Sequence, residues 1–391
     1  MVNILIQNGK IYTMKEAPFY GDIRIKKGRI KEIGVGLKAQ KNEEIIDASG
    51  LLVYPGFIDA HTHLGVGEEG IGFEGNDVNE RSSAITPQLC GYDAYNPNDS
   101  AVEESMRAGV TSVAIGPGSA NVIGGLFSMI KLRASSVDEA LIKVDVGMKC
   151  ALGENPKRVG KESSRAPVTR MGTAAKLRES LYLTKEYMEK KKRYEDDSKN
   201  NESPSYNMQW EALIPVLEGT LPLKMHVHRA DDILTALRIT KEFGITPTLD
   251  HCSDGHLITE YIKESGAAAI VGPTLGFRTK METRNKTFET PSILHEAGIP
   301  VAITTDHPVI PLRELRICAA YAARYGMGQE NALKAITLYP AQIVGLDDRI
   351  GSLEKGKDAD IVLWNGNPLD VFSETEVVII DGEVMYNKSE A

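Results

Sequence analysis

The chain of 391 residues lacks the features that mark several classes of protein. No apolar run approaches the ~20 residues that cross a bilayer. The first residues show no basic segment followed by an apolar one, so no signal peptide is predicted. The net charge is −9, which argues against binding to nucleic acid or to anionic membranes, because that binding depends on positive charge.

Cysteine is scarce, and its residues are far apart at Cys90, Cys150, Cys252 and Cys318, with no C-x-x-C pair. This pattern predicts reduced thiols in a cytoplasmic protein rather than a disulfide framework or a cysteine-based zinc site. The hydrophobic fraction of 42% and charged fraction of 25% are those of an ordinary globular protein. The length allows two or three domains, or one large barrel with an appendage.

Short alternating strands separated by turns are predicted at both ends of the chain. At the start, Asn8-Gly9 is a hairpin signal between residues 4–6 and 10–12, and residues 22–25 and 30–33 form a second pair. At the end, residues 359–364, 377–380 and 383–386 have the same pattern. Each set is too small to hold a core, so we predict one small β-sandwich from both termini, over residues 1–54 and 349–391.

Between the ends, short apolar strands alternate with helical stretches, which predicts βα units and a parallel sheet. There are eight strand candidates, the number that closes a (β/α)8 barrel over residues 55–348. They are residues 56–60, 110–115, 125–130, 144–152, 223–227, 246–250, 268–271 and 301–304. The predicted fold class is therefore α/β, a TIM barrel with a small terminal sandwich. Residues 156–220 form a long excursion that contains a helical run.

Most of the histidines follow predicted barrel strands. His61 and His63 stand two residues apart after the first strand, so both point to one side. His226 and His228 end the fifth strand and His251 ends the sixth. If the barrel closes, these side chains meet at the carboxyl end of the strands, where barrel active sites lie.

Asp306, followed by His307, ends the last strand and adds a carboxylate to this set. Imidazoles with one carboxylate suit Zn²⁺, Fe²⁺ or Mn²⁺, and such an ion lowers the pKa of bound water toward ~7. We predict that Asp306 binds the metal and accepts a proton from that water. The alternative role for Asp306 is the N-cap of a following helix.

The fourth strand offers two further ligands and does not decide between them. Lys149 lies within the strand, where a bare cation is costly; carboxylated by CO₂, it would bridge two metals. Glu154, at the exit of the strand, offers its own carboxylate instead. The alternatives are an ion pair for Lys149 and an exposed loop position for Glu154.

Two blocks of sequence resemble the amidohydrolase superfamily. The first contains residues 46–50 (IDASG) and 55–65 (PGFIDAHTHLG), and the second contains residues 339–341 (YPA) and 351–362 (GSLEKGKDADIV). Within the superfamily the chain is most similar to imidazolonepropionase-like and Xaa-Pro dipeptidase-like hydrolases. Residues 153–158 (GENPKR) resemble a hallmark of members without an assigned substrate.

The resemblance implies one or two divalent metal ions, with zinc the first choice and iron or manganese the alternatives. By position it implies metal-binding roles for His61, His63, His226, His251 and Asp306. Lys149 matches a lysine that is carboxylated in many members, and Glu154 matches a glutamate of the deacetylase-like members. His228 matches a position that orients substrate, and the habit of the family allows a homo-oligomer.

The predicted function is metal-dependent hydrolysis of a C–N bond, amide or cyclic amide, in a small molecule. Asp306 passes a proton to the leaving nitrogen, while His228 or His307 steadies the oxyanion. One alternative is a mononuclear deaminase of a nitrogen heterocycle, which requires an acid near the histidine of the fifth strand; none follows His226 until Asp231. The other is a non-catalytic barrel that serves as a scaffold.

Overall fold

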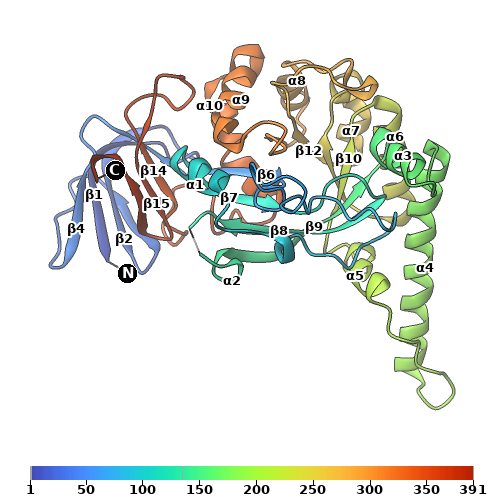
Figure 1. Ribbon diagram of the computed structural model, residues 1–391. Helices are drawn as coiled ribbons and strands as arrows, with labels where there is room; N and C mark the ends of the chain where they lie inside the picture. The colour runs from blue at the N-terminus through green and yellow to red at the C-terminus, as the bar shows by residue number, and fades with distance from the viewer. Residues whose placement is uncertain (1, 134, 391) are drawn as a thin grey trace.

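The computed structural model describes residues 2–133 and 135–390 and contains two β-sheets that lie side by side (Figure 1). One sheet is built from both ends of the chain, in the order β16-β15-β14-β5-β1-β2-β3 with β4 beside β1. Its strands are β1 (Asn3–Ile11), β2 (Phe19–Lys26), β3 (Arg29–Gly34), β4 (Glu43–Asp47), β5 (Leu52–Pro55), β14 (Ile361–Trp364), β15 (Thr375–Ile380) and β16 (Glu383–Asn387). Because β14 pairs with β5, the two ends share one sheet and one core, as the sequence predicted.

The predicted hairpin at Asn8-Gly9 is wrong, because β1 runs through both residues. The register between β1 and β2 shifts between Ile6 and Gly9, and Asn8 has a φ of 65°. The Asn8 N–H donates to Asp22 Oδ1 at 2.9 Å. A Cβ added at Gly9 would lie 2.6 Å from the Val53 side chain. The glycine therefore marks a bulge with close packing, not a chain reversal.

The second sheet is a barrel made of eight strands in sequence order. They are β6 (Phe57–Thr62), β7 (Val110–Ile115), β8 (Ile123–Lys131), β9 (Leu141–Ala151), β10 (Leu223–Val227), β11 (Pro247–His251), β12 (Ala268–Val271) and β13 (Val301–Ile303). All eight predicted strands are present. The ends of the sheet meet where the His63 N–H donates to the His307 carbonyl at 2.9 Å. The TIM barrel with a terminal sandwich is confirmed, while the domain limits at residues 54 and 348 stay a prediction.

One strand departs from the predicted parallel sheet. β8 pairs antiparallel with both β7 and β9, whereas the other neighbouring strands pair in parallel. Only residues 116–122 connect β7 to β8, too few for the crossover that a parallel pair needs. The end of β8, at Lys131, therefore lies at the opposite end of the barrel from the predicted site.

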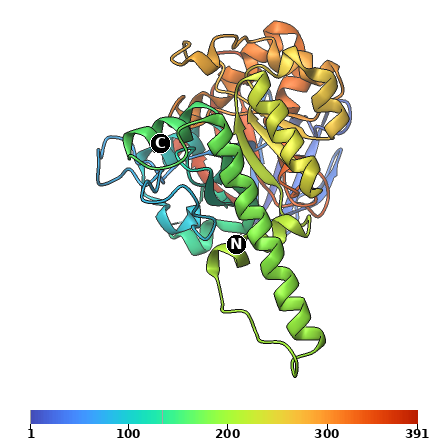
Figure 2. The ribbon, with the colours of Figure 1, turned by 90° about the vertical axis from the view of Figure 1, so that its right-hand side faces the viewer.

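Helices cover the outside of the barrel (Figure 1). They are α1 (Ser100–Arg107), α2 (Val137–Ala140), α3 (Glu154–Glu162), α4 (Arg170–Asp196), α5 (Met208–Leu217), α6 (Ala230–Phe243), α7 (Thr259–Ser265), α8 (Thr290–Glu296), α9 (Leu315–Ala322), α10 (Gln329–Lys334) and α11 (Leu338–Ile343). The predicted excursion contains α3, α4 and α5, and the far end of α4 projects beyond the body (Figure 2). Within the described part of the chain, no helix is long and apolar enough to cross a membrane.

Candidate metal centre

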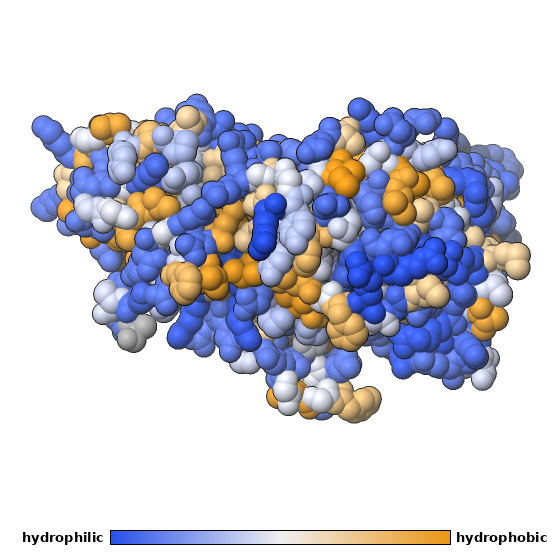
Figure 3. Space-filling model, turned by 90° about the horizontal axis from the view of Figure 1, so that it is seen from above, coloured by the Kyte–Doolittle hydropathy of each residue, from blue (hydrophilic) through white to orange (hydrophobic). Residues whose placement is uncertain are grey.

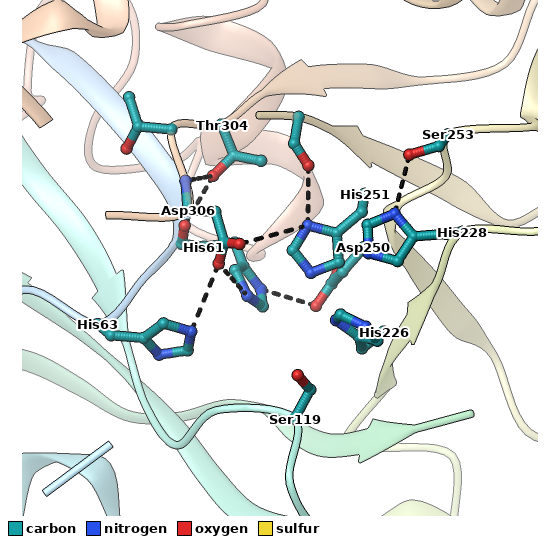
Figure 4. Close-up of polar contacts among 12 residues, drawn as sticks. His61, His63, Ser119, His226, His228, Asp250, His251, Ser253, Thr304 and Asp306 are labelled. Atoms are coloured by element: carbon teal, nitrogen blue, oxygen red, sulfur yellow. Dashed lines mark hydrogen bonds and ion pairs between the residues drawn. The ribbon is translucent and has the colours of Figure 1, made fainter. Parts of the chain in front are cut away.

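A cavity of about 520 Å³ opens at the carboxyl end of the barrel strands. Its lining includes His63, His226, His228, His251 and Asp306. A larger hollow of about 670 Å³ lies along α4 and α5, but no histidine is among the described residues that line it. The histidine-lined cavity is therefore the candidate site. Figure 4 shows its histidines and Asp306 converging from different strands.

The two histidines at the end of β6 are held with one ring nitrogen each facing Asp306. His63 Nδ1 donates to the Gly116 carbonyl at 2.7 Å, and its Nε2 lies 3.4 Å from Asp306 Oδ1. His61 Nδ1 lies 2.8 Å from Asp250 Oδ2, and its Nε2 lies 3.5 Å from Asp306 Oδ1. The partner of each Nδ1 sets the tautomer of its ring, as the outer partners of metal-binding histidines do.

Asp306 lies in the sharp turn after β13, with a φ of 53°. Its N–H donates to Thr304 Oγ1 at 3.0 Å, and the Thr304 hydroxyl donates to the His61 carbonyl at 2.7 Å. The next helical turn begins only at Leu312, with Pro311 as its N-cap. Asp306 is therefore not a helix cap, and the alternative considered for it is wrong.

A second group of three histidines comes from β10 and β11 and the residue beyond β10. His226, His228 and His251 each offer a ring nitrogen within 4.8 Å of the others, and His251 also belongs to a group with His61 and Asp306. His251 Nδ1 donates to the Gly272 carbonyl at 2.8 Å, and His228 Nδ1 lies 2.8 Å from Ser253 Oγ. Burial, with neighbouring histidines adding to it, lowers the pKa of His228 to about 3 and that of His251 well below its ordinary value. Neutral imidazoles are the form that binds metals.

Lys149 lies inside the cluster. The residue is 1% exposed, and its Nζ lies 3.0 Å from His61 Nε2 and 4.0 Å from Asp250 Oδ2. Burial lowers the pKa of Lys149 to about 8, although Asp250 and Asp306 oppose this effect. At neutral pH, the fraction of Lys149 in the neutral amine form is therefore larger than for an exposed lysine.

Glu154, the other bridging candidate, is the half-buried first residue of α3 and is not part of the cavity lining. Its neighbour Asn155 lines the cavity instead, with Nδ2 3.4 Å from His226 Nε2. His307 is buried, and its Nδ1 accepts the Leu312 N–H at 3.1 Å. Neither Glu154 nor His307 therefore joins the cluster in the structure.

Two buried carboxylates near the cluster were not assigned a role from the sequence. Asp250 directly precedes His251, and this position could have predicted that its carboxylate lies close to the histidines. Glu282 lies in the loop after β12, with Oε1 4.0 Å from His226 Nε2 and 3.8 Å from His228 Nε2. No spacing or periodicity connects it with residues more than fifty positions earlier.

Comparison with known proteins places the chain in a family. Residues 213–385 match the model of the amidohydrolase family. A solved structure of an amidohydrolase from Thermotoga maritima is 42% identical, covers 98% of this chain and 100% of that one, and has a TM-score of 0.96.

Two curated relatives agree with this placement. An amidohydrolase of Hapsidospora irregularis, named tasK, is 29% identical over 98% of this chain; the chain spans only 43% of that relative's length. The imidazolonepropionase of Caldanaerobacter subterraneus is 26% identical, over 89% of this chain and 84% of that protein. The chain therefore belongs to the amidohydrolase family.

Proposed function

We propose that the protein hydrolyses an amide or cyclic amide bond of a small molecule with the help of one or two divalent metal ions. The observation that carries the proposal is the placement of Asp306. Its carboxylate faces the ring nitrogens of His61 and His63 from β6, and it forms a ligand group with His61 and His251. The cavity of about 520 Å³ has the size of a small-molecule site.

The residues fit a metal ion. His63 and His251 use Nδ1 for backbone carbonyls, which leaves Nε2 unprotonated in neutral rings. Nitrogen donors with one carboxylate favour zinc, with iron or manganese as alternatives. A bound divalent ion supplies acidity to a water molecule and polarises a substrate carbonyl. Lys149, with its depressed pKa, is the candidate for carboxylation and for joining two ions.

The chain's own residues supply the proton transfers. Asp306 takes a proton from the attacking water and delivers it to the leaving nitrogen. His228 lines the cavity and is held by Ser253, so it orients the substrate and donates to the developing oxyanion. His307 is left out of this role in our proposal, because it is not among the residues that line the cavity.

The two alternatives gain less support. A deaminase requires an acid that reaches the substrate near His226, and Glu282 lies outside the cavity lining although it is close to that histidine. A scaffold would be expected to have lost ligands, whereas all five predicted histidines are buried at the end of the barrel.

Cytoplasmic location and homo-oligomerisation remain parts of the proposal. The four cysteines are free, in keeping with a reducing compartment. On the face seen in Figure 3, hydrophobic residues form separate patches among hydrophilic ones.

The test compares the wild type with Asp306→Asn on a panel of small amides and cyclic amides after loading with zinc. The variant is expected to lose roughly 10²- to 10⁴-fold in rate, the range for a general base. Asp348→Asn removes an exposed acid and is expected to leave the rate unchanged. Release of ammonia from heterocycles, with no amide cleaved, would establish the deaminase instead.

Metal content decides between the two bridging candidates. Mass spectrometry of zinc-loaded protein is expected to show less metal per chain in Lys149→Ala and the wild-type amount in Glu154→Ala. The reverse result would assign the bridge to Glu154, and an absence of metal from the wild type would overturn the proposed mechanism.

A further inference from the structure

One loop supplies two lysines to the lining of the cavity. Lys280 and Lys286 lie on either side of the short turn η3 (Met281–Thr283), in the segment between β12 and α8, and both line the cavity. Among the described residues, Asp306 is the only acid in that lining, and the proposed function already assigns it to a metal ion and to proton transfer. The two lysines therefore bring positive charge that no other acid of the lining balances.

Lys286 has no carboxylate partner. The residue is half-buried, and its Nζ donates to the Gly276 carbonyl at 2.5 Å and lies 3.5 Å from the Phe277 carbonyl. Burial and the nearby Arg278 guanidinium lower the pKa of Lys286, and no acid opposes them among the residues that the structure describes. A partly buried ammonium without a counter-charge is costly, and a negatively charged ligand would reduce that cost.

Lys280 is held in place beside the cavity. Its Nζ donates to Asn155 Oδ1 at 2.8 Å and lies 3.5 Å from Glu282 Oε1. Glu282 is 1% exposed and does not line the cavity, so a ligand in the cavity meets the ammonium and not the carboxylate behind it. An ammonium has three N–H donors, and these two contacts leave one for a ligand. Because the lysine is fixed before a ligand arrives, less conformational entropy is lost on binding.

The Lys280 ammonium lies close to the histidine cluster. Asn155, which accepts its hydrogen bond, has Nδ2 3.4 Å from His226 Nε2. A single side-chain amide thus separates the ammonium from the candidate metal centre. A small molecule with its amide bond at the histidines would bring a charged group a few bonds away within reach of Lys280.

The outer part of the cavity is apolar. Phe277 and Val309 line it, although they are 83% and 59% exposed. An apolar group of a ligand would remove part of this surface from water. A suitable probe therefore combines an apolar group with a negative charge.

We propose that Lys280 and Lys286 bind a negatively charged group of the substrate, so that the amides which this protein hydrolyses carry a carboxylate or a phosphate. The inference rests on the proposed function and deepens it, because it names the substrate class of the same site. A lysine binds either anion as a point charge, so both share the chemistry that the two residues recognise. A neutral amide of the same shape would leave Lys286 without a counter-charge and is expected to bind weakly.

The test compares the binding of hippurate and hippuramide to the metal-depleted full-length chain by isothermal titration calorimetry at neutral pH. The two probes share one skeleton and differ only in whether a carboxylate or a neutral carboxamide ends it. Their ring can contact Phe277, and without metal the carboxylate cannot bind an ion. The wild type is expected to bind hippurate roughly tenfold more tightly than hippuramide. Added salt is expected to reduce this preference.

Variants of the two lysines separate charge from loop structure. Lys286→Gln removes the charge but keeps a donor for the Gly276 carbonyl, and it is expected to lose most of the preference, whereas Lys286→Arg is expected to retain it. Lys280→Met is also expected to reduce the preference. Lys263→Met removes an exposed lysine outside the cavity lining and is expected to match the wild type. If Lys280→Met fails to fold because Glu282 loses its partner, the Lys286 variants decide the matter.

The phosphonate analogue of hippurate distinguishes the two anions, because the tighter of the two ligands identifies the group that the lysines select. Equal binding of hippurate and hippuramide, or no binding of either, would overturn the inference. An unchanged preference in Lys286→Gln would overturn it too.

Hydrolysis tests the two proposals separately. Equal rates of the zinc-loaded protein on acidic and neutral amides of matched shape would overturn the inference and leave the hydrolase intact. Failure to hydrolyse any amide, with the preference for hippurate retained, would refute the proposed hydrolase instead.

Discussion

Two buried lysines on neighbouring barrel strands have opposite surroundings. Lys131 ends β8 at the side of the barrel that meets the terminal sheet, and its side chain is fully buried. Its Nζ lies 2.9 Å from Asp358 and 3.1 Å from Asp360, and it also pairs with Asp381. Burial opposes its charge, but the three aspartates outweigh burial and raise the pKa of Lys131.

Lys149, on the adjacent strand β9, is equally buried but faces the cluster of histidines. Its closest carboxylate, Asp250, is 4.0 Å away and also lies 3.3 Å from Lys224. Burial therefore prevails and lowers the pKa of Lys149 to about 8. The same residue type therefore has a raised pKa at one end of the barrel and a lowered pKa at the other.

The comparison shows what decides the direction in which the pKa of a buried lysine shifts. Three carboxylates fix the charge of Lys131, and they join the barrel to the loops beside β14 and β15. Lys149 has fewer acids close to its amine, and its carboxylation remains part of our proposal. The number of carboxylates close to each amine, not the burial of the side chain, decides whether its pKa is raised or lowered.

The largest expected effect on stability follows from Lys131→Met. The change leaves three buried or partly buried aspartates without their common partner, which is expected to cost about 3–5 kcal/mol of unfolding free energy. Urea denaturation of the metal-free protein measures it. A loss below about 1 kcal/mol would show that Arg29, Arg133 and Arg349 are enough to pair Asp358 and Asp381.

A smaller effect is expected from Asp358→Asn. This residue also pairs with Arg349 at 2.9 Å, but Lys131 retains Asp360 and Asp381 when the charge is removed. A loss of about 1–3 kcal/mol is expected in the same denaturation experiment. An effect equal to that of Lys131→Met would mean that Asp358 carries the whole network.

Phe127→Leu tests the aromatic ring that lies between Lys149 and His61. The ring lies 4.9 Å from the His61 ring, and Lys149 and Lys224 lie 5.3 and 5.1 Å from its centroid. Loss of packing and of the cation–π contacts is expected to cost about 1–2 kcal/mol and to weaken metal binding. Phe57→Leu, another buried phenylalanine, is the control and should leave metal binding unchanged.

The smallest effect on stability is expected from Lys149→Met, and it sharpens the comparison most. Because burial lowers the pKa of Lys149, its protonated form is unfavourable in the fold, and its removal should change the metal-free stability by less than about 1 kcal/mol. Metal content and hydrolysis should nevertheless fall. A stability loss as large as that of Lys131→Met would place Lys149 among the structural lysines.

Much of the fold was predictable because it depends on local pattern. Apolar runs located all eight barrel strands, and alternation located most of the terminal strands, but not β4 and β5. Asn8-Gly9 misled because the same two residues suit a bulge as well as a hairpin, and only the pairing of β1 with β2 decides between them. The direction of β8 was predicted wrongly, because the expected βα units assumed parallel strands. The connection between β7 and β8 is too short for a parallel crossover.

The site was predictable to the extent that its residues end apolar strands. His61, His63, His226, His228, His251 and Asp306 all come together in the structure, although their binding of metal stays a prediction. Glu154 was selected on its position after β9, but the start of α3 places Asn155 in the cavity lining instead. Glu282 lay beyond such reasoning, because it belongs to a loop.

The sequence by itself determined the barrel, the shared terminal sheet and the end of the barrel at which the histidines gather. These follow from hydrophobic period and from the side of a strand to which each residue points. Only the tertiary structure decided which lysine meets three aspartates and which carboxylate faces His226 and His228. It also decided that Glu154 lies outside the cavity lining. Those outcomes depend on contacts between residues far apart in the chain, and no local pattern contains them.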